Sequence, residues 1–188
     1  MQIGLFFGSF NPIHTGHLLI ANHILNFTPL HKIWFIVSPQ NPLKEDVELL
    51  NEEQRLKLVR LATNGDKRFE VSDIEFQLPK PSYTINTFSY LRKAYPENSF
   101  RLIIGSDNFL NFSAWKSHDE LLREGKIVVY IRPGYPVDTF TAQVEVLTPA
   151  QLDISSTEIR RLIKDGKSVR YLVPEAVFLE IATNNYYR

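Results

Sequence analysis

The fold of this chain is decided by the stretch Ile3-Gly-Leu-Phe-Phe-Gly-Ser-Phe-Asn-Pro-Ile-His14-Thr-Gly-His17-Leu-Leu-Ile-Ala21. An apolar run typical of a β-strand leads into a turn rich in Gly, Asn and Pro, and an amphipathic segment typical of a helix follows. The pattern predicts a strand that feeds a helix N-terminus, where backbone N–H groups point outward and favour anions. His14 and His17 stand at this helix start, which indicates phosphate chemistry.

Strand-like and helix-like segments alternate along the rest of the chain. The predicted strands are Gln2–Phe7, Lys32–Val37, Phe69–Ile74, Phe100–Ile104, Ile127–Ile131 and Val144–Leu147. The predicted helices are Gly16–Phe27, Asn51–Thr63, Thr84–Ala94, Ser155–Lys164 and Pro174–Ala182. This alternation predicts an α/β fold with a mostly parallel sheet and helices on both faces. Ligands bind such sheets beyond the carboxyl ends of the strands, and the opening motif lies just after the first strand.

The composition is that of an ordinary globular protein. The 188 residues suit a single domain, 1–188, that can bury a core without cross-links. The 21 basic and 21 acidic side chains cancel, so the totals indicate neither nucleic-acid nor membrane binding. The absence of cysteine excludes disulfides, thiolate metal sites and cysteine nucleophiles. No secretory leader is apparent at the N-terminus, and no apolar run reaches the roughly 20 residues of a membrane helix, so we expect a cytoplasmic protein.

The histidine pair is ambiguous when taken alone. Residues three apart share a face of a helical first turn, so both imidazoles could address one ligand. Gly16 between them would let a phosphate approach the backbone. For an isolated pair, however, the favoured interpretation is one exposed histidine and one structural histidine. Zinc is disfavoured, because the chain has no cysteine and no His-Glu-x-x-His arrangement.

A second helix start of similar character is Asp153-Ile-Ser155-Ser156-Thr157-Glu158-Ile-Arg160-Arg161. Ser155 and Glu158 match a capping box, which by itself is a structural device. Ser156 and Thr157 add hydroxyl groups, and Arg160 follows one turn later on the same side, so the segment could clamp a polyphosphate. The chain lacks G-x-x-x-x-G-K-[ST], and no G-x-G-x-x-G follows its first strand. A Walker-type ATPase and a dinucleotide-binding dehydrogenase are therefore disfavoured.

These two motifs resemble those of a known superfamily. His14-Thr-Gly-His17 resembles the (H/T)xGH motif of nucleotidylyltransferases, and Ile154-Ser-Ser-Thr157-x-x-Arg160 resembles their ISSTxxR motif. The resemblance covers nearly the whole chain and implies a Rossmann-like α/β fold. The chain is most similar to the bacterial nicotinate-nucleotide adenylyltransferase branch, through Pro81-Ser-Tyr83-Thr84-x-x-Thr87, Gly105-Ser-Asp107-Asn108, Trp115-Lys116 and Tyr171-Leu-Val-Pro174. It departs from that branch where Phe7-Gly8-Ser9-Phe10-Asn11-Pro12 replaces Gly-Gly-Thr-Phe-Asp-Pro, and where Pro42-Leu43-Lys44 replaces Pro-His-Lys.

The resemblance implies that ATP and nicotinate mononucleotide react to give deamido-NAD (nicotinate adenine dinucleotide) and pyrophosphate in NAD biosynthesis. The nucleophile is a phosphate oxygen that is already ionised, so the reaction depends on positioning and charge stabilisation rather than on a general base. The catalytic residues implied are His14, His17, Lys44 and Arg160. We expect Mg²⁺ to be carried by the ATP phosphates, with no metal site made by the protein.

Further residues are implied at the two substrate sites. Those for ATP are Gly8, Ser9, Phe10, His14, His17, Gly105, Asp107, Arg132, Ile154, Ser155, Ser156, Thr157 and Arg160. Those for nicotinate mononucleotide are Lys44, Tyr83, Thr84, Thr87 and Trp115. Asp107 has a helix N-cap as its alternative role, and Arg132 has that of a solvated loop arginine. The remaining histidines, His23, His31 and His118, are interpreted as surface or structural residues.

Several alternatives stay open at this level. The acceptor could be nicotinamide mononucleotide or phosphopantetheine, both used elsewhere in the superfamily. From a different class of protein, the chain could be a non-catalytic nucleotide sensor, although the intact histidines and Arg160 argue against that. We expect no nucleic-acid or membrane partner, and a homo-oligomer is left open.

Overall fold

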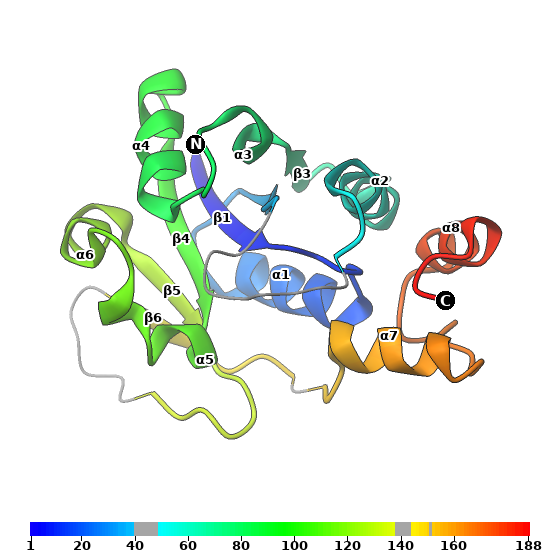
Figure 1. Cartoon of the computed structure of the whole chain (residues 1–188). Helices are drawn as coiled ribbons and strands as arrows, with labels where there is room; N and C mark the ends of the chain where they lie inside the picture. The colour runs from blue at the N-terminus through cyan, green and yellow to red at the C-terminus, as the bar shows by residue number, and fades with distance from the viewer. Residues whose placement is uncertain (40–48, 138–143, 151) are drawn as a thin grey trace.

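The computed structural model describes residues 1–39, 49–137, 144–150 and 152–188, and its centre is a six-stranded sheet (Figure 1). The strands are β1 (Gln2–Gly8), β2 (Lys32–Val37), β3 (Phe69–Ser72), β4 (Ser99–Gly105), β5 (Ile127–Tyr130) and β6 (Val144–Leu147). They lie in the order β3-β2-β1-β4-β5-β6, and each neighbouring pair is parallel. This is the strand order of a doubly wound, Rossmann-like sheet. The predicted α/β fold is therefore confirmed.

Helices cover both faces of the sheet (Figure 1). They are α1 (Thr15–Phe27), α2 (Glu52–Thr63), α3 (Ile74–Gln77), α4 (Thr84–Ala94), α5 (Ser106–Phe109), the 3₁₀ turn η1 (Phe112–Ala114), α6 (His118–Gly125), α7 (Ser156–Lys164) and α8 (Glu175–Asn184). Successive strand residues point to opposite faces, so Leu5 and Phe6 belong to two separate cores. The core around Phe6 packs against α1, α2, α7 and α8, and the core around Leu5 packs against α3, α4, η1 and α6.

The predicted strands and helices are all present, with ends that move by a few residues. The expectation of extended structure through Ile74 is wrong at its end, because β3 stops at Ser72 and Ile74 opens α3. Three short elements, α3, α5 and η1, were not predicted, since a single turn is too short to show a period. The two-turn helix α6 was also missed. Its sequence does carry a signal, with acidic residues in the first turn and Arg123 in the last.

The sheet order places the opening motif at a switch point. β1 lies between β2 and β4, so chain connections run outward in opposite directions from the β1–β4 pair. The carboxyl ends of these two strands, Gly8 and Gly105, therefore border the crevice in which doubly wound folds bind ligands. Among the described residues, no helix has the length and apolar character needed to cross a membrane.

Candidate active site

The two motif histidines lie against each other at the start of α1. Their ring centroids are 3.7 Å apart and the rings are stacked. The backbone N–H of His14 donates to Nδ1 of His17 at 3.2 Å, and the backbone N–H of His17 donates to the carbonyl of His14 at 3.0 Å. Neither imidazole is exposed, because His14 is buried and His17 is half-buried, so the interpretation of one exposed and one structural histidine does not describe this pair.

Two glycines make room for this arrangement. A Cβ on Gly16 would lie 3.0 Å from Nδ1 of His14, and a Cβ on Gly8 would lie 2.9 Å from the ring of Phe10. Phe10 itself has φ +45°, a left-handed conformation that non-glycine residues rarely adopt. Its ring is buried and meets the ring of His17 edge-on at 5.2 Å. The part of Phe10 that can face a ligand is therefore its backbone, as the sequence-based expectation requires.

The second motif lies directly against the first. Oγ of Ser156 donates to the carbonyl of Pro12 at 2.8 Å, and Nη1 of Arg160 donates to the carbonyl of Asn11 at 2.9 Å. Ile154 lies beside Gly16, 3.9 Å from the place a Cβ would occupy there. Helix α7, about 140 residues further along the chain, therefore starts at the turn between β1 and α1. The two motifs form one site.

The hydroxyl groups at the start of α7 have partners that differ in part from those expected. Ser155 is the N-cap and accepts the backbone N–H of Glu158 at 3.2 Å, as predicted. The Glu158 carboxylate, however, pairs with Arg161 at 2.6 Å, where a capping box would turn it back to the N-cap. The Ser156 hydroxyl holds Pro12, so what Ser156 offers a phosphate is its backbone N–H. Thr157 is exposed in the first turn of the helix.

Asp107 and Arg132 join the carboxyl ends of β4 and β5. Nη1 of Arg132 pairs with Oδ2 of Asp107 at 2.9 Å, and the backbone N–H of Arg132 donates to Oγ of Ser106 at 2.9 Å. The N-cap alternative for Asp107 is wrong, because Gly105 is the N-cap of α5. The Arg132 side chain is 41% exposed but pairs with Asp107, so its guanidinium has a fixed partner at this edge of the sheet. Oδ1 of Asp107 is buried with no hydrogen-bond partner among the described residues, which leaves an acceptor for a ligand hydroxyl.

Burial sets the charge state of the histidines. It lowers the pKa of His14 to about 4, and the Arg132 cation acts in the same direction. The pKa of His17 is held well below its usual value, by burial first and then by His14 and Arg132. Both imidazoles are therefore neutral at pH 7 in the free protein. Negative phosphates placed against them would act in the opposite direction and raise both pKa values.

This pKa shift makes a prediction about stability. In the unfolded chain His14 titrates near 6.5, so on acidification the unfolded state takes up its proton first. The contribution of His14 is therefore complete above pH 6.5 and is lost as the pH falls toward 4. Between pH 7.5 and pH 5 we expect a loss of about 2 kcal/mol from this residue. Urea unfolding measures the free energy of unfolding at both pH values. Between pH 7.5 and pH 5 this free energy should fall less for His14→Gln than for the wild type. Equal losses in the two proteins would contradict the assignment.

The residues expected at the acceptor site gather at the start of α4. Tyr83 is the N-cap of this helix and Thr84 is its first residue. Nζ of Lys116 lies 4.5 Å above the Tyr83 ring, which brings the segment after η1 to the same place. Trp115 packs on Phe112 with ring centroids 5.4 Å apart. Tyr83, Thr84 and the segment of Trp115 are therefore neighbours, as an acceptor pocket requires.

The expected contact of Thr87 with the substrate needs a correction. The hydrogen bond that its hydroxyl makes instead identifies Glu75, a residue that the sequence analysis did not single out. Thr87 is fully buried, and its hydroxyl donates to Oε1 of Glu75 at 2.7 Å. Oε2 of Glu75 accepts the Ser82 hydroxyl at 3.0 Å. Thr87 and Ser82 are therefore both bonded to Glu75, and these two hydrogen bonds fix the start of α4. The available signal was an acidic residue between two apolar ones, Ile74 and Phe76.

The other expectations fall outside this site. Lys44 lies outside the described residues, and its role stays a prediction. His31 accepts the backbone N–H of Gln2 at 3.1 Å, His23 packs on a phenylalanine ring at 4.4 Å, and His118 pairs with Asp119 at 3.2 Å. These three histidines have the surface or structural roles expected of them.

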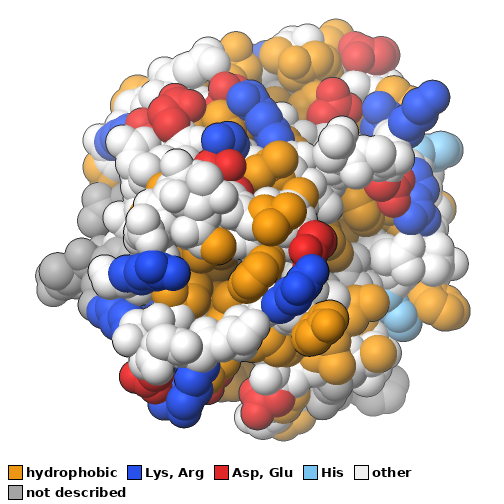
Figure 2. Space-filling model, turned by 90° about the vertical axis from the view of Figure 1, so that its right-hand side faces the viewer, with side chains coloured by type: hydrophobic (Ala, Val, Ile, Leu, Met, Phe, Trp, Pro, Cys, Tyr) orange, Lys and Arg blue, Asp and Glu red, His pale blue; other side chains and the backbone are white. Residues whose placement is uncertain are grey.

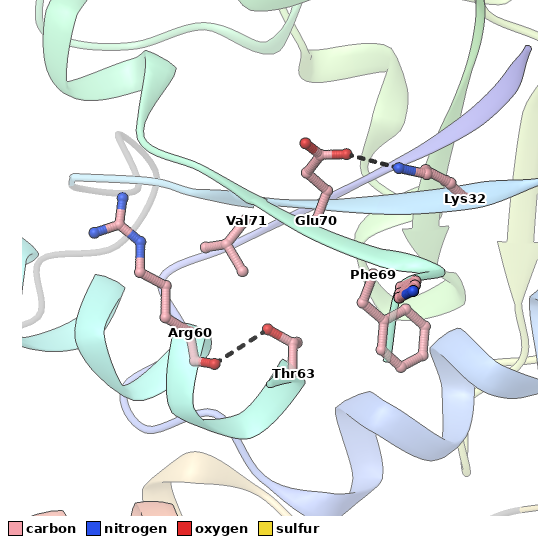
Figure 3. Close-up of a pocket in the computed structure, with 7 residues that line it drawn as sticks. Lys32, Arg60, Thr63, Phe69, Glu70 and Val71 are labelled. Carbon is pink, nitrogen blue, oxygen red and sulfur yellow. Dashed lines mark hydrogen bonds and ion pairs between the residues drawn. The ribbon is translucent and has the colours of Figure 1, made fainter. Parts of the chain in front are cut away.

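A hollow of about 510 Å³ at the β3 edge of the sheet is separate from this site (Figure 3). None of the motif residues lines it. Lys32 pairs there with Glu70 at 3.2 Å, and Arg60 pairs with Asp73 at 3.7 Å. Thr63 donates back into its own helix, to the carbonyl of Val59. These polar groups are engaged within the fold.

Known proteins share both the sequence and the fold of this chain. Residues 5–162 match the model of the Cytidylyltransferase-like family. A relative from Cytophaga hutchinsonii, named probable nicotinate-nucleotide adenylyltransferase, is 46% identical over an alignment of 190 residues that covers 100% of this chain and 98% of the relative. A relative of the same name from Bacteroides fragilis is 48% identical, over 96% of this chain and 90% of its own length. The chain belongs to the nicotinate-nucleotide adenylyltransferase family.

The structural comparison agrees on the fold. A nicotinic acid mononucleotide adenylyltransferase from Plasmodium falciparum, solved in complex with NaAD, matches with a TM-score of 0.83. Its sequence identity is 18%, and the match covers 99% of this chain and 97% of that one. A second solved structure, a putative nicotinate-nucleotide adenylyltransferase from Vibrio parahaemolyticus, matches with a TM-score of 0.73 at 20% identity over 100% and 95% of the two chains. Both solved structures therefore share the fold of this chain at low sequence identity.

Proposed function

We propose that this chain transfers the adenylyl group of ATP to nicotinate mononucleotide, giving deamido-NAD and pyrophosphate in NAD biosynthesis. The observation that carries the proposal is the convergence of His14, His17 and Arg160 on one turn at the carboxyl end of β1. Full-length relatives at 46–48% identity bear the name of this activity. A turn with adjoining imidazoles and a guanidinium is suited to holding a triphosphate.

The reaction needs no proton to be taken from its nucleophile. A phosphate oxygen of nicotinate mononucleotide forms a bond to the α-phosphorus of ATP. The bond from that phosphorus to the oxygen bridging the α- and β-phosphates breaks, and pyrophosphate leaves. The protein accelerates such a transfer by positioning the two phosphates and by stabilising the charge of the transition state.

The roles divide between the two motifs. His14 and His17 donate hydrogen bonds to the α-phosphoryl group as it is transferred. Nδ1 of His17 accepts the His14 backbone N–H, so the proton of this neutral imidazole sits on Nε2, where it can be donated. Arg160, with Thr157 and the backbone of Ser156, holds the phosphates that leave. Oδ1 of Asp107 accepts from the ATP ribose.

Mg²⁺ enters with ATP as part of the substrate. Within the described residues no group of three or more His, Cys, Asp and Glu side chains is placed to hold an ion. We call the turn between β1 and α1, residues 9–14, the phosphate turn. The groups facing it are neutral imidazoles and guanidinium groups, which bind phosphate oxygens rather than a cation. This donor set fits a magnesium ion that is carried by phosphate oxygens and water.

The acceptor is bound at the start of α4. Thr84 offers its backbone N–H and hydroxyl to the nicotinate carboxylate, Trp115 stacks on the pyridine ring, and Tyr83 closes the pocket.

Nucleic acid is not expected as a partner. On the side of the molecule where α7 and α8 lie, basic and acidic side chains alternate around a band of apolar ones, without a continuous basic stripe (Figure 2). The cytoplasmic location and any homo-oligomer stay predictions.

One assay separates this function from its alternatives. Purified protein is given Mg·ATP with nicotinate mononucleotide, nicotinamide mononucleotide or phosphopantetheine, and pyrophosphate release is followed. We expect release with nicotinate mononucleotide and a kcat/KM at least tenfold lower with the nicotinamide analogue. Activity confined to phosphopantetheine would overturn the choice of acceptor. Binding of ATP without turnover on any acceptor would instead indicate a nucleotide sensor.

A further inference from the structure

Arg55 of helix α2 is a fully buried cation that none of the motifs includes. Its Nη1 donates to the carbonyls of Ser9 at 2.6 Å and Ser38 at 2.7 Å. Its Nη2 donates to the carbonyl of Pro39 at 2.7 Å, and its Nε donates to that of Leu50 at 2.9 Å. Among the described residues no carboxylate forms an ion pair with it. The guanidinium therefore holds backbone oxygens from three separate segments.

One of these segments is the phosphate turn itself. Ser9 belongs to the turn between β1 and α1, Ser38 and Pro39 follow the end of β2, and Leu50 precedes α2. A buried cation is costly to desolvate, and the four hydrogen bonds to backbone carbonyls offset this cost. What an apolar residue would not reproduce is the fixed fork of donors, which sets the positions of the carbonyls that it binds.

The turn needs external support, because its backbone is strained. Phe10, directly after Ser9, has φ +45°, and such a conformation persists in a non-glycine residue only where the surroundings impose it. Arg55 fixes the residue before Phe10. The residue after it, Asn11, is fixed by Arg160 at its carbonyl and by the Leu50 N–H and the Tyr187 hydroxyl at its side chain.

We propose that Arg55 is a positioning residue for adenylyl transfer, which holds the Ser9–Asn11 turn in the conformation that meets the α-phosphate without touching substrate. This inference rests on the proposed function, because that function places the α-phosphate at this turn. Displacement of a positioning group by about 1 Å can lower a rate by two orders of magnitude. The loss on removing Arg55 therefore falls on kcat more than on the KM values.

Arg55→Met and Arg55→Lys test the proposal, with Arg60→Met as the matched control. Arg60 lies in the same helix, but its side chain is 59% exposed and pairs with Asp73 at the surface. We expect Arg55→Met to fold and to lower kcat about 100-fold, with both KM values within about threefold of wild type. Arg55→Lys keeps the charge but lacks the planar fork, so we expect its kcat to fall at least tenfold. Arg60→Met should behave as wild type.

The outcomes separate this inference from the proposed function. The activity of the wild type shows which acceptor is used. The kcat and KM of each Arg55 variant are then measured with that acceptor and compared with those of the wild type. A kcat within threefold of wild type for a folded Arg55→Met would overturn the positioning role. So would a loss confined to KM, or a failure of both Arg55 variants to give cooperative urea unfolding, because a purely structural role would then suffice.

Discussion

His17→Ala is expected to lower kcat about a thousandfold while leaving the fold intact. Loss of one preorganised donor to a developing charge costs roughly 10²–10³ in rate. His17 also supports His14, because the two rings stack at 3.7 Å and Nδ1 of His17 accepts the His14 backbone N–H. Both contributions act on the same transferred group, so the effect lies at the upper end of that range.

The measurement is steady-state kcat and KM for both substrates, with urea unfolding as the check on the fold. His23→Ala is the matched control, since His23 lies further along the same helix and packs on Phe27. His17→Gln refines the test. Its side-chain amide can donate from nearly the place of Nε2, so we expect it to recover part of the rate that alanine loses. A near-wild-type rate for His17→Ala would remove the histidine from the mechanism.

The fold and the meeting of the two motifs could be predicted because their signals are local. Each strand and helix of useful length carries its own periodicity, and the alternation of the two dictates a parallel sheet. The turn at His14 and the helix start at Ser156 each resemble an anion site on their own. A parallel sheet then brings residues that follow its strands to one edge, where the structure shows Ser156 bonded to Pro12.

What could not be predicted depends on distant partners. Arg55 lies in a helix that otherwise looks amphipathic, and nothing in its local sequence shows that carbonyls 9, 38, 39 and 50 surround it. The position of the Thr87 side chain likewise depends on Glu75, twelve residues earlier, whose carboxylate accepts a hydrogen bond from the Thr87 hydroxyl. The resemblance assigned Thr87 to the substrate, and only the tertiary structure shows that its side chain is buried and bonded to Glu75.

Arg160→Met is expected to lower kcat/KM for ATP about a thousandfold, and Arg160→Lys about a hundredfold. The Arg160 side chain is buried and donates to the carbonyl of Asn11, so its positive charge is fixed beside the turn that receives the α-phosphate. Pyrophosphate leaves with more negative charge than it carries in ATP, and a fixed cation at that side stabilises the transition state more than the ground state. Lysine retains the charge but loses the planar fork that matches phosphate oxygens.

The next residue along the chain supplies the control for this prediction. Arg161 is exposed and bonds to Glu158 and Asp165, so Arg161→Met removes an arginine from the same helix without touching the turn. Both variants are compared in the forward reaction and in the reverse reaction, where pyrophosphate is a substrate. If Arg160 binds the leaving group, Arg160→Met raises the KM for pyrophosphate and Arg161→Met does not. A loss confined to the KM for nicotinate mononucleotide would place Arg160 on the acceptor phosphate instead, and equal kinetics for the two variants would exclude it from the site.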